Sequence, residues 1–198
     1  MKKKSIVFVV ALFALISTSA LAQVKVALGI KAGPNFSTVN ASDAGATYKS
    51  RTGWHGGGFV LFKLSKIGIQ PEVLFSQQGA NVHYSTSQQS VDFNYVNVPI
   101  IIKLYTVLGI NLQVGPQFGF LANSPTVRDP QGQTIDNAYK KSDMSAALGV
   151  GWDLPLGITL DARYNLGLSK INNDAAMSTA KNQVWQISVG YKLIQFGK

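Results

Sequence analysis

Residues 143–169 alternate between apolar and polar side chains in two runs separated by a short break. The apolar positions of the first run are Met144, Ala146, Leu148, Val150, Trp152 and Leu154. Those of the second run are Ile158, Leu160, Ala162, Tyr164, Leu166 and Leu168. Successive side chains of a strand point to opposite faces, so the pattern predicts a hairpin with one apolar and one polar face. Pro155 interrupts the alternation, and Leu156 and Gly157 complete the predicted turn.

Six further segments resemble these two runs, which gives eight predicted strands in the chain. The six are residues 26–36, 53–64, 67–78, 94–105, 109–121 and 183–193. The connections alternate in length: those at 65–66, 106–108 and 155–157 are tight, whereas 37–52, 79–93, 122–142 and 170–182 are long and polar. Short periplasmic turns and long external loops are typical of outer-membrane barrels. The predicted fold class is therefore all-β, an eight-stranded antiparallel up-and-down transmembrane β-barrel.

Composition decides which face of the strands is expected to point outward. Charged residues make up 14% of the chain, against about 25% in ordinary soluble domains. The polar face carries mostly small and amide side chains, which suit the lumen of a narrow barrel. Aromatic residues expected in an interfacial girdle lie near the predicted strand ends: Trp54, Tyr105, Trp152, Trp185 and Tyr191. The alternative is a soluble sandwich or lipocalin-like barrel, which this composition disfavours.

The first 22 residues have the pattern of a secretory signal peptide. Lys2, Lys3 and Lys4 precede an apolar stretch at 6–16, and a small-residue cleavage site follows at 20–22. We therefore expect residues 1–22 to be a cleaved signal peptide and residues 23–198 to be one outer-membrane barrel domain. Removal of the three lysines lowers the formal net charge from +9 to +6. Export argues against nucleic acid as the partner of this charge, and anionic lipid headgroups are the expected counter-charge.

Seven charged residues fall on the predicted polar face: Lys31, Lys63, Glu72, Lys103, Asp161, Arg163 and Lys192. One interpretation is a selectivity ring or a ligand site. The interpretation that we favour is a structural ion-pair network, because buried charges must be paired and an eight-stranded lumen holds only side chains. We expect its centre to comprise Glu72, Lys103, Asp161 and Arg163.

The chain offers no clear catalytic, metal or cofactor site. His55 is expected in a strand and His83 in a loop, without the clustered ligands that a metal needs. His83, Ser85 and Asp92 share one predicted loop, but three common polar residues in a polar loop are expected by chance. Gly56, Gly57 and Gly58 lack the remainder of a phosphate-loop motif and instead predict curvature or close backbone approach.

Prolines lie within four of the predicted strands and predict local irregularities. Gly33-Pro34 echoes Gly115-Pro116, and Pro71 and Pro99 lie in other strands. Proline cannot donate to a strand ladder, so bulges are expected at these positions. Such bulges would shift the inward and outward positions by one residue.

Several short segments follow one another in a characteristic order: QPEVLFS at 70–76 with Gly79, Val98-Pro99 leading to Lys103, GPQ at 115–117, LGVG at 148–151, DARYNLGL at 161–168 and GYKL at 190–193. Their order and spacing give the chain a resemblance to the small outer-membrane β-barrels of Bacteroidota often called PorT-like. It implies an eight-stranded barrel with a signal peptide, and the name-giving member is associated with type IX secretion. The chain departs from the pattern at 194–198, which extend beyond the expected last strand; Phe196 is the candidate terminal aromatic residue.

We therefore expect an integral outer-membrane protein with a structural, surface-interaction or secretion-accessory role. It is expected to be a monomer and not an enzyme, and to need no cofactor. Outer-membrane lipid, lipopolysaccharide and secretion-system proteins are the expected partners. The alternatives are a small outer-membrane pore and a surface lipid-modifying enzyme.

Overall fold

The computed structural model describes residues 24–40, 47–83, 88–123, 127–128, 134–135, 142–168 and 181–197. The predicted signal peptide at 1–22 lies outside the described residues. Among these residues, no helix has the length and apolar character needed to cross a membrane.

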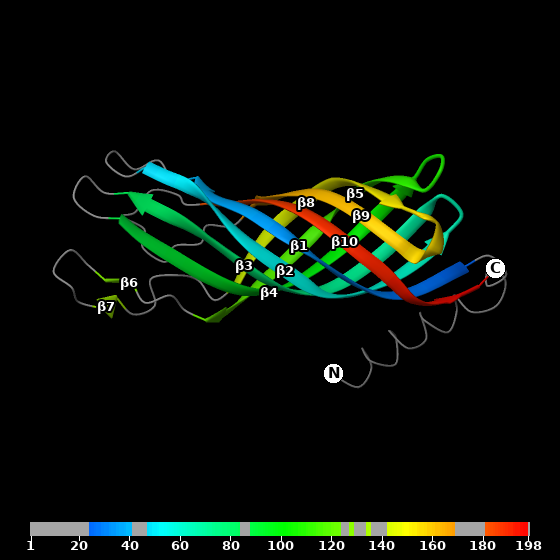
Figure 1. Cartoon of the computed structure of the whole chain (residues 1–198), viewed down its shortest axis with the longest axis horizontal. Helices are drawn as coiled ribbons and strands as arrows, with labels where there is room; N and C mark the ends of the chain where they lie inside the picture. Colours follow the sequence, from blue (N-terminus) through cyan, green and yellow to red (C-terminus); the bar gives the residue numbers. More distant parts are fainter. Residues whose placement is uncertain are drawn as a thin grey trace, which may run out of the picture.

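Eight antiparallel strands close into a single barrel (Figure 1). The strands are β1 (Val24–Asn40), β2 (Thr47–Leu64), β3 (Ile67–His83), β4 (Gln88–Tyr105), β5 (Ile110–Asn123), β8 (Ser142–Asp153), β9 (Ile158–Gly167) and β10 (Lys181–Phe196). Each strand pairs with its neighbour along the chain, and β1 pairs with β10 to close the ring. A separate two-stranded ladder joins β6 (Val127–Arg128) to β7 (Thr134–Ile135). The predicted fold class is confirmed.

Several strands are longer than the sequence pattern predicts. β2, β3 and β4 have 17 or 18 residues, whereas a membrane-spanning strand needs about 9–11. The sequence predicted that these extra residues lie in the loops 37–52 and 79–93. That prediction is wrong at the edges of both loops, where residues 37–40, 47–52, 79–83 and 88–93 form strand. The prediction also ended the last strand at residue 193, whereas β10 continues to Phe196.

The two ends of the barrel differ in their connections. Residues 65–66, 106–109 and 154–157 form one end, called here the tight-turn end; the third turn includes a short 3-10 segment, η2 (Pro155–Gly157). Gly109 and Gly157 have positive φ, which glycine adopts without the cost that other residues incur. β1 begins and β10 finishes at this end, and the opposite, far end carries the extensions of β2, β3 and β4 (Figure 1).

The prolines do not shift the register, contrary to the prediction. Pro71 pairs opposite Ile100 and Pro99 opposite Gln117, within ladders of constant register on either side. The register shifts lie instead at Leu28/Gly29, between Ser50 and His55, and at Asn94/Tyr95. The inward and outward positions of β3 and β4 therefore follow the simple alternation through both prolines.

The apolar face points outward and the polar face points into the lumen. Leu148, Val150 and Leu160 are exposed on the outer wall, whereas Thr159 and Asp161 are buried. Outward aromatic residues lie toward both ends: Trp54 and Trp185 toward the far end, and Trp152 and Tyr191 toward the tight-turn end. This is the distribution expected of aromatic girdles at two membrane interfaces.

Tyr105 corrects one of the girdle predictions. It is 6% exposed, and its hydroxyl donates a 2.8 Å hydrogen bond to Asp153 in the lumen. Tyr105 shares inward parity with Lys103 on β4, so its place near a strand end did not make it an interfacial residue.

Membrane orientation can be tested by cysteine labelling, because the chain has no cysteine of its own. Lys66→Cys lies in an exposed tight turn, and Ala122→Cys lies exposed near the far end of β5. With a polymer-linked maleimide too large for porins, we expect intact cells to label Ala122→Cys, and Lys66→Cys to label only after outer-membrane disruption. The reverse result would invert the orientation.

Candidate functional site: the charged lumen

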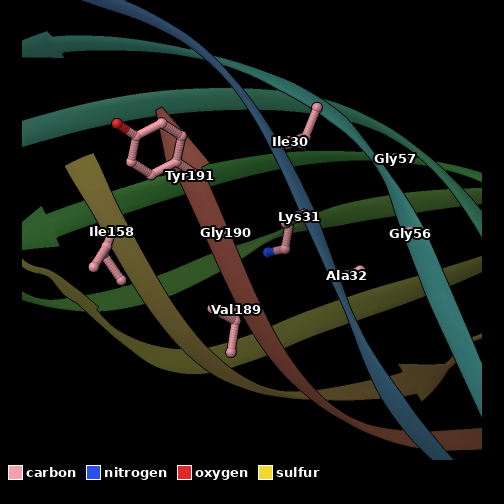
Figure 2. Close-up of a pocket in the computed structure, with 9 residues that line it drawn as sticks. All are labelled: Ile30, Lys31, Ala32, Gly56, Gly57, Ile158, Val189, Gly190 and Tyr191. Carbon is pink, nitrogen blue, oxygen red and sulfur yellow. The ribbon is translucent and has the colours of Figure 1, made fainter. Parts of the chain in front are cut away.

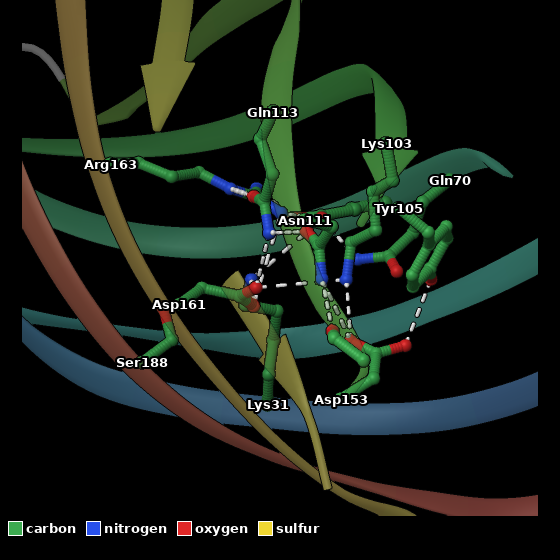
Figure 3. Close-up of polar contacts among 12 residues, drawn as sticks. Lys31, Gln70, Lys103, Tyr105, Asn111, Gln113, Asp153, Asp161, Arg163 and Ser188 are labelled. Atoms are coloured by element: carbon green, nitrogen blue, oxygen red, sulfur yellow. Dashed lines mark hydrogen bonds and ion pairs between the residues drawn. The ribbon is translucent and has the colours of Figure 1, made fainter. Parts of the chain in front are cut away.

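Seven charged side chains from six strands form what is called here the lumen charge network. Its members are Lys31 on β1, Glu72 on β3, Lys103 on β4, Asp153 on β8, Asp161 and Arg163 on β9, and Lys192 on β10. They are held inward by strand alternation, and Gln113 of β5 contributes amide contacts to the same group. The four residues expected at the centre of the network all lie within it. Figure 3 labels three of them: Lys103, Asp161 and Arg163.

Arg163 and Glu72 form the most directional pair of the network. The two guanidinium nitrogens Nη1 and Nη2 of Arg163 donate to the carboxylate oxygens of Glu72 at 2.9 and 2.6 Å. Arg163 Nε donates to Gln113 Oε1 at 2.6 Å, and Gln70 donates to Glu72. A planar guanidinium suits this two-point contact, which fixes the separation of β3 and β9 across the lumen.

Within the lumen charge network, Asp161 has the most charged partners. Its carboxylate lies 2.7 Å from Lys31 Nζ, 3.6 Å from Lys103 Nζ and 4.0 Å from Arg163 Nη2. It also accepts a hydrogen bond from Gln113 Nε2. Three cations from three strands therefore share one buried carboxylate.

Asp153 forms a second centre at the tight-turn end. Its carboxylate accepts hydrogen bonds from Lys103 at 3.3 Å and from the Tyr105 hydroxyl at 2.8 Å (Figure 3). It also accepts one from Lys192 at 2.8 Å. Lys103 thus links Asp153 to Asp161 and makes the network continuous. Asp153 was not among the charged residues that the sequence predicted for the network.

A histidine-centred chain lies nearer the far end of the lumen. His55 Nδ1 lies 2.7 Å from Asn35 Oδ1, and His55 Nε2 lies 2.7 Å from Ser188 Oγ. The Asn35 amide nitrogen donates to three oxygens, including Ser76 Oγ, so Asn35 Oδ1 is left as an acceptor. A neutral His55 that carries its proton on Nδ1 donates a hydrogen bond to this oxygen. The sequence did not predict these hydrogen bonds. The only indication of them in the sequence is that Asn35, His55 and Ser188 all occupy inward positions on their separate strands.

The order serine, histidine, asparagine matches the nucleophile, base and orienting group of some hydrolases. Ser188 is only 3% exposed, and Asn35 and His55 are fully buried. A substrate carbonyl needs free space about 3 Å from the nucleophile. We therefore interpret the hydrogen bonds among Ser188, His55 and Asn35 as structural contacts that join β1, β2 and β10.

The trio His83, Ser85 and Asp92 is not brought together as one loop. His83 is the last residue of β3 and Asp92 lies in β4, so their assignment to a loop was wrong; Ser85 lies outside the described residues. His83 pairs with Gln88 and Asp92 with Gly79, four pairs apart, which corresponds to about 13 Å along the ladder. Within the described ranges, no group of three or more histidine or acidic residues could hold a metal ion.

The outer wall carries an apolar hollow of about 590 Å³ over β1, β2 and β10 (Figure 2). Its lining comprises the small residues Ala32, Gly56, Gly57 and Gly190 and the larger residues Ile30, Ile158, Val189 and Tyr191. A Cβ at Gly57 would meet the backbone carbonyl of Val73, so the predicted close approach of strands is present there. Lys31 also borders the hollow, but its ammonium group pairs with Asp161 in the lumen. The hollow therefore presents no charged group for chemistry.

Comparison with known proteins agrees with this architecture. The family model described as outer membrane protein beta-barrel domain matches residues 21–173. The chain belongs to this family. Membership of this family indicates localisation in the outer membrane. No curated protein matches the chain.

Solved structures of small barrels resemble the fold at low sequence identity. Neisserial surface protein A is 12% identical, with a TM-score of 0.57 over 84% of this chain and 97% of its own. The attachment invasion locus protein Ail of Yersinia pestis, in complex with the heparin analogue sucrose octasulfate, is 16% identical, with a TM-score of 0.53 over 88% of this chain and 99% of its own. At such identities these likenesses show the fold alone.

Proposed function

We propose that this outer-membrane barrel is a closed scaffold with a structural and surface-interaction role. The observation that carries the proposal is the lumen charge network, whose ion pairs link six strands across the interior. Side chains can fill the interior of an eight-stranded barrel. An ion crossing this lumen would have to displace buried ion pairs, so the network supports a closed barrel over a small pore.

The far end is where we place the interaction surface. β2, β3 and β4 continue past the length that a membrane-spanning strand needs, and they project together at that end (Figure 1). Recognition in rigid scaffolds is concentrated in such projecting segments and their connections. Ail, a barrel of similar fold, was crystallised with a sulfated sugar analogue, which is consistent with a surface-binding role for such barrels.

A secretion-accessory role of the PorT-like kind is the narrower form of this proposal. It is supported by the short segments shared with PorT-like barrels, among them DARYNLGL at 161–168. Affinity purification of the full chain from native outer membrane after cross-linking should then recover components of a secretion system. Recovery of lipopolysaccharide alone would favour the general surface role.

Closure of the lumen can be tested in planar lipid bilayers. We expect the purified wild-type protein to give no steady single-channel current, because the lumen charge network blocks the interior. The matched control is Val73→Ala, an outward neighbour of Glu72 that leaves the network intact and should behave like the wild type. Retained heat-modifiable migration would show that the inserted protein is folded. Steady currents from the wild type would contradict the closed-scaffold proposal and favour a small pore.

A further inference from the structure

A cavity of about 250 Å³ opens at the tight-turn end of the barrel, beside the ion pairs of Asp153. It is called here the mouth cavity, and three lysines line it: Lys25 at the start of β1, Lys63 near the end of β2 and Lys192 on β10. Ala27, Leu61 and Phe196 add apolar surface. The cavity thus combines concentrated positive charge with an apolar wall.

Two of these lysines repel each other when no anion lies between them. Lys25 and Lys63 lie directly opposite each other on the paired strands β1 and β2. Like charges at directly opposed positions of an antiparallel pair destabilise the sheet. Neither lysine forms an ion pair with a carboxylate among the described residues; Lys63 Nζ lies 3.6 Å from the centre of the Tyr105 ring instead.

Among the described residues, Asp153 is the one carboxylate that lines the mouth cavity, and it already has partners. Asp153 accepts hydrogen bonds from Lys103, Lys192 and Tyr105. Its charge is therefore shared by two lysines before Lys25 or Lys63 is considered. Along the described part of the chain, the cavity keeps an excess of positive charge that an external anion would neutralise.

We propose that the mouth cavity binds a phosphate group. A phosphate offers several acceptor oxygens, so it can bridge the opposed ammonium groups of Lys25 and Lys63 with charge-assisted hydrogen bonds. The apolar wall suits a phosphate carried on an organic group. Tight turns of outer-membrane barrels face the periplasm, so the phosphate comes from a lipid headgroup of the periplasmic leaflet or from a free periplasmic phosphate compound.

The test measures the unfolding midpoint of the full chain with two probes. Inorganic phosphate is added to protein in a phosphate-free detergent, and phosphatidylglycerol is added to protein in the same detergent as mixed micelles. Each probe is applied to the wild type, Lys25→Gln, Lys63→Gln and Lys66→Gln. Lys66 lies in the 65–66 turn at the same end but does not line the cavity, so its variant controls for the loss of one positive charge.

We expect at least one probe to raise the midpoint of the wild type and of Lys66→Gln saturably. Lys25→Gln and Lys63→Gln should each weaken the apparent affinity for that probe by about tenfold or more. Without a probe, the same two variants should unfold at or above the wild-type midpoint, because the like-charge repulsion is removed. A response to phosphatidylglycerol alone identifies the lipid headgroup as the source, whereas a response to inorganic phosphate identifies a free phosphate.

Two results would overturn the proposal. In the first, neither probe shifts the wild-type midpoint. In the second, Lys25→Gln and Lys63→Gln respond as strongly as Lys66→Gln, which would mean that the barrel attracts anions only through its overall charge.

Discussion

Replacing Asp161 by asparagine should lower the free energy of unfolding by about 3–5 kcal/mol, the cost of breaking a buried ion pair from one side. The change keeps the size of the side chain but removes the carboxylate shared by Lys31, Lys103 and Arg163, all within 4.0 Å. Those cations are almost fully buried, so water cannot compensate for the lost partner. Urea unfolding in lipid vesicles measures the effect.

A double variant separates charge imbalance from general damage to the lumen. Lys31→Met combined with Asp161→Leu removes both members of the pair whose atoms lie 2.7 Å apart. Replacing both partners by apolar groups is far less costly than removing one, so the double variant should be more stable than Asp161→Asn. If the two are equally unstable, the network contributes packing rather than charge pairing.

Arg163→Leu provides a graded comparison within the same network. It removes the two-point contact with Glu72, but Lys31 Nζ remains 3.7 Å from that carboxylate. We therefore expect a loss of stability smaller than that of Asp161→Asn. An equal or larger loss would make Arg163 the principal residue of the network.

The barrel could be predicted from the sequence because membrane and lumen impose opposite polarities on alternate residues. Residues 143–169 show this most clearly, and within β8 and β9 the predicted outward and inward faces agree with the structure. The ends of the long strands could not be predicted in this way. The segments 47–52 and 79–83 lack a continuous apolar face in the sequence, so they look like loop sequences although both are strand.

The lumen site was predictable in its membership but not in its geometry. Inward parity identified Glu72, Lys103, Asp161 and Arg163, and the structure brings all four together. The number of partners that each charged residue contacts depends on the stagger of neighbouring strands. A single sequence does not reveal that stagger. For the same reason Asp153 and the pairing of His55 with Ser188 became visible only in the closed barrel.

Placing arginine on the outer wall should destabilise the barrel by an amount that depends on depth. Leu148→Arg should cost about 2–4 kcal/mol if the tight-turn end sits at one membrane interface, because Leu148 is then near the bilayer midplane. Leu148 is the seventh of twelve residues in β8 and is 51% exposed on the lipid-facing side. Leu160→Arg should cost less, since Leu160 lies near the start of β9 and pairs with Trp152 close to the tight turn.

Denaturant titration in vesicles compares the two arginine variants with Leu148→Ala and Leu160→Ala, which remove the leucine side chain without adding charge. The difference between arginine and alanine at each position isolates the cost of charge in lipid. A larger difference at Leu148 than at Leu160 is expected, because an arginine near the interface can extend its guanidinium to the headgroups. Equal differences would place the two residues at the same depth, and no difference at Leu148 would mean that the outer wall of β8 does not face lipid.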